Sequence, residues 1–228
     1  MATLYVVATP IGNLEDISPR ALRILKEVST VLCEDTRLTR KLLSHYDIHT
    51  PTLSYHANSD EGKEERIIAL LREGKDLALV SDAGTPAISD PGAKLVSAVR
   101  SALGAEVSII AVPGPSALTA ALSVSGLPSS DFLFLGFLPH KKGRQSLFEE
   151  IAGSSRTVVF YESPHRLLKT LEALAEKLDS SRTLVVSREI SKIYEEVVSD
   201  SPQGVRAYFE ANPEKVRGEF VLMVSGRN

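Results

Sequence analysis

Three short segments of the sequence carry residues that could bind a small ligand. They are Thr9-Pro10-Ile11-Gly12-Asn13, Ser81-Asp82-Ala83-Gly84-Thr85-Pro86 and Pro113-Gly114-Pro115-Ser116. Each follows an apolar run typical of a strand, and glycine lets a ligand approach the backbone without meeting a Cβ atom. Ligands of α/β sheets bind beyond the carboxyl ends of the strands, so the three segments together favour one ligand site, although each alone also fits a tight turn.

These segments lack the fingerprints of several common enzymes. The sequence contains neither G-x-x-x-x-G-K-[ST] nor G-x-G-x-x-G, which disfavours a phosphate loop and the ordinary dinucleotide site. The nearest approach to a hydrolase elbow is Gly114-Pro115-Ser116-Ala117-Leu118, which lacks the second glycine of G-x-S-x-G. A serine hydrolase is therefore disfavoured as well.

Apolar runs rich in β-branched residues predict the strands that would position these segments. The predicted strands are Leu4–Ala8, Thr30–Cys33, Leu77–Val80, Val107–Val112, Phe132–Leu138, Thr157–Tyr161, Leu184–Ser187 and Phe220–Val224. Several are continuously apolar rather than alternating, which is typical of sheets covered by helices on both faces. We therefore predict an α/β fold.

Helix ends are marked by capping residues. Predicted starts pair a serine cap with proline: Ser18-Pro19, Ser163-Pro164 and Ser201-Pro202. Glycines predicted to close helices over 61–73, 92–103 and 116–125 in the left-handed conformation are Gly74, Gly104 and Gly126. An apolar stripe at helical spacing, which predicts a packing face, consists of Leu167, Leu168, Leu171 and Leu174.

Domain organisation follows from one interruption of the pattern. Pro113-Gly114-Pro115 breaks the alternation of strands and helices about halfway along the chain, whereas no long Gly/Ser linker and no internal repeat is present. We predict an N-terminal α/β domain over residues 1–113 and a C-terminal α/β domain over residues 114–228.

Composition narrows the class of protein. The 228 residues are 43% hydrophobic and 24% charged, as expected of a folded chain, and the net charge of −3 requires any nucleic-acid contact to be local. Cys33 is the only cysteine, which excludes an internal disulfide and multi-cysteine metal sites, and we expect it to be buried. No apolar stretch approaches the roughly 20 residues of a membrane span, and no secretory signal pattern is present, so we expect a soluble, cytoplasmic protein.

The motifs resemble, in order, a known family. They are Thr9-Pro10-Ile11-Gly12-Asn13-Leu14, Glu34-Asp35-Thr36-Arg37, Ser81 through Pro86 continuing to Ser89-Asp90-Pro91-Gly92, Phe160-Tyr161-Glu162-Ser163-Pro164-His165-Arg166 and Arg188-Glu189-Ile190. Together they resemble the tetrapyrrole methylase superfamily, and within it the methyltransferases that modify a cytidine ribose 2′-hydroxyl at the decoding centre of 16S ribosomal RNA. The resemblance runs from about Leu4 to Gly226.

The resemblance implies a class III methyltransferase: two α/β domains with S-adenosyl-L-methionine in a cleft between them, usually a homodimer, and no metal. Its substrate would be small-subunit ribosomal RNA in the assembled 30S subunit. Implied cofactor contacts, mostly through backbone, are Pro10, Gly12, Asp82, Thr85, Ile88, Ser116, Ala117, Tyr161 and Phe220.

Methyl transfer to a ribose requires a group that takes the hydroxyl proton or stabilises the alkoxide. Candidate catalytic residues are Glu34, Asp35, Arg37, His56, Glu162 and Glu189. The sequence does not select the base among them. Glu34-Asp35-Thr36-Arg37 also fits a capped, salt-bridged turn, His56 an ordinary partly buried histidine, and Glu189 a simple ion pair with Arg188 or Lys192.

Local positive charge suggests where RNA binds. The candidate RNA-binding residues are Arg40, Lys41, Lys141, Lys142, Arg144, Arg188 and Lys192, with Arg37 and His140 beside the first two clusters. A solvated surface run would give the same pattern.

Two other functions fit the same residues. One is a methyltransferase acting on a small tetrapyrrole, and the other is a ribosome-associated binding protein without turnover. Many relatives continue past the equivalent of Gly226 with a helical extension, whereas this sequence stops at Asn228. We therefore expect a short or truncated member, with cofactor binding retained and RNA docking less well defined.

Overall fold

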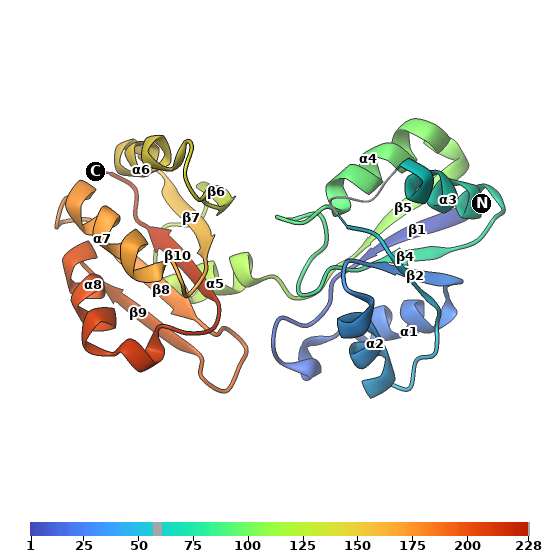
Figure 1. Ribbon diagram of the computed structural model, residues 1–228, viewed down its shortest axis with the longest axis horizontal. Helices are drawn as coiled ribbons and strands as arrows, with labels where there is room; N and C mark the ends of the chain where they lie inside the picture. Colours follow the sequence, from blue (N-terminus) through green and yellow to red (C-terminus); the bar gives the residue numbers. More distant parts are fainter. Residues whose placement is uncertain (57–60, 228) are drawn as a thin grey trace. The chain divides into compact units, whose positions relative to one another are not determined.

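The computed structural model describes residues 1–56 and 61–227. The chain forms two compact units, Met1–Ser116 (unit 1) and Ala117–Asn228 (unit 2), which are described separately (Figure 1). The division falls just after Pro113-Gly114-Pro115, the interruption in the sequence pattern. Each helix within the described residues is too short or too polar to cross a membrane.

Unit 1 contains a parallel five-stranded sheet in the order β3-β2-β4-β1-β5. The strands are β1 (Ala2–Val7), β2 (Thr30–Cys33), β3 (Thr52–Ser54), β4 (Leu77–Leu79) and β5 (Val107–Val112). The helices are α1 (Pro19–Glu27), α2 (Thr36–His45), α3 (Glu61–Arg72) and α4 (Gly92–Leu103), with 3-10 turns η1 (Leu14–Asp16) and η2 (Gly104–Glu106).

Helices cover both faces of this sheet, which explains its continuously apolar strands (Figure 1). On one face, Ile24 of α1 and Leu43 of α2 join a core that includes the fully buried Cys33, as predicted for that residue. On the other face, Ile67 of α3 and Leu95 of α4 form a second core. Because all strands are parallel, their carboxyl ends meet at one border, which we call the unit 1 edge.

Unit 2 contains a mixed sheet in the order β6-β7-β10-β8-β9, in which only β6 and β7 pair in parallel. The strands are β6 (Phe132–Phe137), β7 (Thr157–Glu162), β8 (Leu184–Arg188), β9 (Glu196–Asp200) and β10 (Phe220–Val224). The helices are α5 (Ala117–Ser125), α6 (Arg144–Gly153), α7 (Leu167–Lys177) and α8 (Pro202–Ala211), with a 3-10 turn η3 (Pro213–Lys215).

This sheet is also covered on both faces. Leu122 of α5 packs against Val159, Val185 and Val221 on one face. The residues Phe148 of α6, Leu171 of α7 and Phe209 of α8 form the core of the other face. The predicted α/β class is therefore confirmed for each unit.

Most of the predicted helix ends are confirmed. The side chains of Ser18 and Ser201 cap α1 and α8 by accepting hydrogen bonds from the backbone N–H groups of Ala21 and Gly204, both at 3.1 Å. The three glycines Gly74, Gly104 and Gly126 follow α3, α4 and α5 with φ of +83°, +50° and +71°. These local signals succeed because capping depends on neighbouring residues.

Two helix predictions are wrong in detail. α7 begins at Leu167 rather than at Ser163-Pro164, because the preceding residues form a turn in which Arg166 N–H donates to Ser163 O at 3.0 Å. Within the leucine stripe, Leu168 is 39% exposed, whereas the other three leucines are fully buried.

Two strands, β3 and β9, were not predicted. Strand β3 is only three residues long, and β9 carries polar residues at its ends.

Candidate active site

The unit 1 edge gathers predicted site residues from the loops after all five strands. They are Pro10 and Gly12 after β1, Glu34, Asp35 and Arg37 after β2, His56 after β3, Asp82, Thr85 and Ile88 after β4, and Ser116 after β5. Residues up to about a hundred positions apart in the chain thus lie along one border of one sheet. The parallel topology alone accounts for this gathering.

Three of these loops are interlocked by backbone contacts. Thr9 N–H donates to Gly84 O at 2.9 Å, and Gly84 N–H donates back to Thr9 O at 3.1 Å. Thr85 Oγ1 donates to Pro115 O at 3.0 Å. Gly84 has a φ of +81°, and a Cβ atom there would lie 3.2 Å from Ile11 Cγ2 and 3.6 Å from Pro115 O. The three glycine- and proline-bearing segments therefore pack against one another at the unit 1 edge.

Carboxylates give the unit 1 edge a negative character. The pKa of Glu34, an exposed side chain, is raised by partial desolvation and then by the nearby charges of Asp82 and Asp90, while His56 opposes the shift. Asp82 Oδ1 accepts the backbone N–H of Asp35 at 3.1 Å. These contacts place the loops after β2 and β4 side by side and concentrate negative charge around Glu34.

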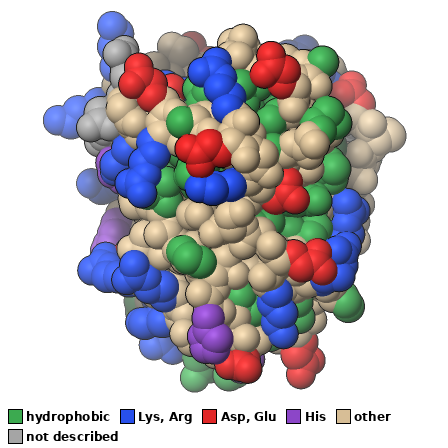
Figure 2. Space-filling view, turned by 90° about the vertical axis from the view of Figure 1, so that its right-hand side faces the viewer, with side chains coloured by type: hydrophobic (Ala, Val, Ile, Leu, Met, Phe, Trp, Pro, Cys, Tyr) green, Lys and Arg blue, Asp and Glu red, His purple; other side chains and the backbone are tan. Residues whose placement is uncertain are grey.

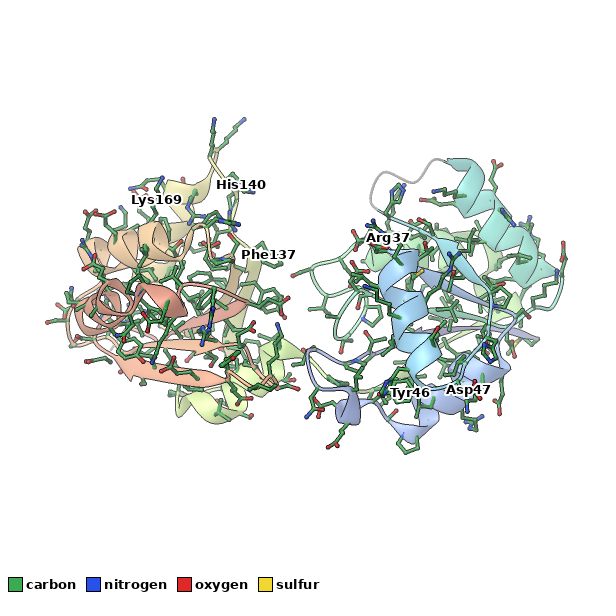
Figure 3. All side chains as sticks on the ribbon, turned by 60° about the horizontal axis from the view of Figure 1, so that its bottom comes forward. Arg37, Tyr46, Asp47, Phe137, His140 and Lys169 are labelled. Atoms are coloured by element: carbon green, nitrogen blue, oxygen red, sulfur yellow. The ribbon has the colours of Figure 1, made fainter. Side chains whose placement is uncertain are left out.

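Asp35 and Arg37 are engaged with each other. Asp35 is the N-cap of α2, and its carboxylate accepts Arg37 N–H at 2.8 Å, Arg37 Nε at 3.1 Å and Arg37 Nη2 at 2.7 Å. These hydrogen bonds lower the pKa of Asp35 to about 2. Arg37 extends from the first turn of α2 with its side chain 85% exposed (Figure 3). The pair forms a capped, salt-bridged turn, which was the alternative to a catalytic role in the sequence analysis.

The loop after β4 contains strained backbone. Ala87 and Ser89 have φ of +71° and +65°, a left-handed conformation that costs of order 1–3 kcal/mol for residues with side chains. Asp90 Oδ1 holds this conformation by accepting the N–H groups of Ala87 at 2.9 Å and Gly92 at 2.7 Å. Ile88 stands between the two strained residues and is 45% exposed. Asp90 is thus a positioning residue to which the sequence assigned no role, although its Ser-Asp-Pro-Gly motif was visible.

Unit 2 also collects predicted residues at one border, which we call the unit 2 edge. Phe220 of β10 pairs with Glu162 of β7 on one side and with Arg188 of β8 on the other. Tyr161 lies at the same end of β7, and its pKa is raised by burial, although a hydrogen bond with the backbone of Leu118 partly opposes the shift. That contact places Tyr161 beside the first turn of α5, which begins at Ala117.

Glu162 is a buried anchor rather than a base. Its side chain is inaccessible and accepts hydrogen bonds from Arg144 Nη2 at 3.0 Å, Thr170 Oγ1 at 2.6 Å and Ser163 N–H at 2.9 Å. Arg166 Nε lies 2.6 Å from Oε1, close enough for charge pairing but not aligned for a hydrogen bond. We therefore expect Glu162 not to act as the base and Arg144 not to contact RNA, because the buried carboxylate is shared by Arg144 and Arg166.

Three more candidates are committed to structural contacts. Arg188 is 5% exposed and donates to Tyr194 O and Arg217 O, both at 3.1 Å. Its guanidinium is therefore not available to a phosphate of bound RNA. Glu189 accepts Lys192 Nζ at 2.8 Å and Glu219 N–H at 2.9 Å. Burial opposes the effect of these contacts, but together they lower the pKa of Glu189. The Glu189–Lys192 pair is the ion pair that the sequence left open.

The remaining basic candidates are exposed. Lys141 and Lys142 lie in the loop before α6, and Arg40 and Lys41 lie on α2, where Arg40 Nε also donates to Thr52 Oγ1 at 3.1 Å. The face in Figure 2 carries both acidic and basic side chains, and its Lys and Arg side chains gather mainly along the left border of the view. Any phosphate contact therefore depends on local groups of cations.

Comparison with known proteins identifies the family. The family model for tetrapyrrole (corrin/porphyrin) methylases matches residues 3–202. The ribosomal RNA small subunit methyltransferase I of Xylella fastidiosa is 49% identical over 225 residues, covering 98% of this chain and 81% of the relative. The protein of the same name from Thermotoga maritima is 45% identical over 227 residues and is covered completely.

Solved structures agree on the fold. Uroporphyrin-III-C-methyltransferase from Thermus thermophilus is 23% identical with a TM-score of 0.65, covering 99% of this chain and 94% of that chain. The methyltransferase CobJ is 18% identical with a TM-score of 0.71, covering 99% and 95%. The two sheets, the motif-bearing edges and these similarities together show that the chain belongs to the tetrapyrrole methylase family and groups with the ribosomal RNA small subunit methyltransferase I proteins.

Proposed function

We propose that this protein transfers the methyl group of S-adenosyl-L-methionine to the ribose 2′-hydroxyl of a cytidine in 16S ribosomal RNA. The observation that carries the proposal is the 49% and 45% identity, over 98% and 100% of this chain, to ribosomal RNA small subunit methyltransferase I proteins. The gathering of the motif residues of this chain at the edges of its two sheets supports it. The homodimer, the assembled 30S subunit as substrate and the cytoplasmic location remain parts of this proposal.

The unit 1 edge suits a cationic methyl donor. The donor supplies a methyl group on a positively charged sulfur, and the carboxylates of Glu34, Asp82 and Asp90 give this edge the complementary charge. Gly12 and Ala83, in the interlocked loops around Gly84, are exposed residues with small or no side chains, so a ligand can approach the chain there. In unit 2, Ala117, Tyr161 and Phe220 remain proposed cofactor contacts.

We expect Gly84→Ala to weaken cofactor binding about tenfold or more. Gly74→Ala is the matched control, because Gly74 has a φ of +83° but nothing within 4 Å of its ideal Cβ position. Both substitutions carry the left-handed strain of about 1–2 kcal/mol, but only Gly84→Ala places its Cβ too close to a neighbour, the side chain of Ile11. Calorimetric titration with the cofactor measures the difference, and equal affinities in the two variants would contradict the assignment.

Glu34 is the group that we propose as the proton acceptor. It is exposed at the unit 1 edge, whereas Asp35 is held by Arg37, Glu162 is buried and Glu189 pairs with Lys192. Glu34 would accept the hydroxyl proton as the ribose oxygen takes the methyl group, which the donor would supply by breaking its carbon–sulfur bond with the electron pair left on sulfur. A raised pKa favours this role, because a carboxylate that binds protons more tightly is a stronger base.

We expect Lys141→Gln with Lys142→Gln to weaken RNA binding and to reduce its salt dependence. Each lost phosphate contact lowers the slope of log K against log salt by about 0.7 to 0.9. Lys63→Gln with Lys75→Gln, two lysines of unit 1, supplies a control of equal charge change. Binding measured from low to moderate salt tests the prediction, and identical slopes for both double variants would count against a phosphate-binding loop.

One experiment separates the proposed function from its alternatives. The full chain is incubated with labelled cofactor and, in parallel, with small subunits lacking the modification, naked ribosomal RNA or a tetrapyrrole. Mass spectrometry then locates the methyl group. Methyl on a cytidine ribose supports the proposal, methyl on a tetrapyrrole carbon supports a small-molecule enzyme, and RNA binding without transfer supports a binding protein.

A further inference from the structure

An exposed aromatic ring ends strand β6. Phe137 is 57% exposed, although the next residue, Leu138, is 1% exposed. Figure 3 places Phe137 and His140 close together along the border of unit 2. Exposing a phenylalanine to water costs hydrophobic free energy. The backbone feature that keeps Phe137 exposed therefore needs an explanation.

A β-bulge turns Phe137 outward. In the pairing of β6 with β7, Phe134 lies opposite Val159 and Phe137 opposite Tyr161, so β6 contains one residue more than its partner over this step. Gly136, inside the bulge, has a φ of +60°, which glycine adopts without strain. A bulge of this kind redirects the side chain that follows it and is typical of functional borders of sheets.

Aromatic neighbours fix the orientation of the Phe137 ring. The centroid of the Tyr161 ring lies 5.3 Å from that of Phe137 at an interplanar angle of 56°, and 5.1 Å from that of Phe134 at 72°. The tilted contact with Tyr161 covers one side of the Phe137 ring, and Tyr161 in turn packs edge-on against Phe134, while more than half of the Phe137 surface stays accessible. The ring is therefore presented in an ordered position before any partner binds.

The segment after Phe137 is held in place at its beginning and then presents positively charged side chains. Arg166 Nη1 donates to Leu138 O at 2.7 Å, and Arg144 Nη1 donates to Pro139 O at 3.1 Å. Both arginines are bound in turn to the buried Glu162. The next three residues, His140, Lys141 and Lys142, are exposed. An aromatic surface and two lysine cations thus lie within a few residues of one another, beside a backbone segment held by two arginines.

We propose that Phe137 is a stacking platform for a base of the RNA substrate, with Lys141 and Lys142 binding the adjacent phosphates. The inference rests on the proposed function. An unpaired or extruded base exposes the π-face that stacks on an aromatic ring, whereas bases inside a duplex do not. The cations beside the ring favour RNA over an apolar protein surface, because phosphates complement them.

The test compares Phe137→Ala, Phe137→Leu and Phe137→Trp in the full chain. The probes are small subunits lacking the modification and a short single-stranded RNA carrying a fluorescent cytidine analogue. We expect Phe137→Ala and Phe137→Leu to bind both probes about tenfold or more weakly, because one base–aromatic stack is lost. Phe137→Trp should retain affinity and quench the fluorescence of the analogue. Val124→Ala, at an exposed apolar residue of α5, is the control.

The outcomes are distinguishable. Stacking also predicts that Phe137→Ala leaves the salt slope of RNA binding and the cofactor affinity unchanged. Wild-type affinity of Phe137→Leu, or an altered oligomeric state of Phe137→Ala with normal RNA binding, overturns the platform. The failure of the unaltered protein to methylate any RNA would instead overturn the proposed function on which the inference rests.

Discussion

Replacing Glu34 by glutamine should lower the rate of methyl transfer by a factor of about 10² to 10⁴, the usual contribution of a general base. Glutamine keeps the size of the side chain but cannot accept the proton of the ribose hydroxyl. Because Glu34 also contributes to the negative charge of the unit 1 edge, cofactor affinity should fall as well, and the rate is therefore compared at saturating cofactor. Single-turnover transfer to small subunits, with saturating cofactor, measures this rate.

The pH dependence of this rate has a definite sign. Glu34 acts as its carboxylate, so the rate should rise with pH through a pKa that lies above the ordinary glutamate value of about 4.3. Asp82→Asn keeps an oxygen for the N–H of Asp35 but removes a charge that raises the pKa of Glu34. The acidic limb of the profile should therefore move to lower pH in this variant.

Stability provides a control for Glu34→Gln. A carboxyl whose pKa is raised on folding contributes stability below its unfolded pKa and loses that contribution as pH rises through its folded pKa. At neutral pH the ionised Glu34 faces Asp82 and Asp90, so glutamine should not destabilise the fold.

The activity control is Asp35→Asn, which keeps a cap acceptor for α2 and should retain far more activity than Glu34→Gln. Full activity of Glu34→Gln with loss in Asp35→Asn would reverse the assignment.

Replacing Glu162 by alanine should lower the free energy of unfolding by about 3–5 kcal/mol, because it leaves two largely covered arginines without their buried carboxylate. The Glu162 side chain is inaccessible, and those of Arg144 and Arg166 are each 16% exposed. Removing it also releases the anchor of the loop that begins at Leu138. Urea unfolding followed by circular dichroism measures the loss.

The matched control is Glu210→Ala on α8. Glu210 pairs with Arg206 one turn away, but their side chains are 50% and 35% exposed, so the loss should stay below about 1 kcal/mol. Glu162→Gln should fall between the two, because it keeps one acceptor and introduces an amide beside the arginines. Equal losses for Glu162→Ala and Glu210→Ala would contradict the buried anchor.

Local signals in the sequence predicted much of the fold. Ser18 and Ser201 cap helices, and three glycines close them, because these effects involve residues within one turn of each other. The local signal fails at Ser163-Pro164, because the residues around it are held by distant partners: Glu162 binds Arg144, and Arg166 donates to Leu138 O. Strand β9 was missed because an exposed edge strand does not need a continuous apolar pattern.

The sequence by itself determined the family, most of the strands of the two sheets and the identity of the loops at the strand ends, because motifs and periodicity depend on neighbouring residues. Only the tertiary structure decided which acidic candidate is available for chemistry. Asp35, Glu162 and Glu189 resemble Glu34 in type, but their carboxylates are held by donors, several of them from distant segments, such as Arg144 and Glu219. Hydrogen bonding and burial depend on the partners that folding brings together, and no spacing in the sequence specifies those partners.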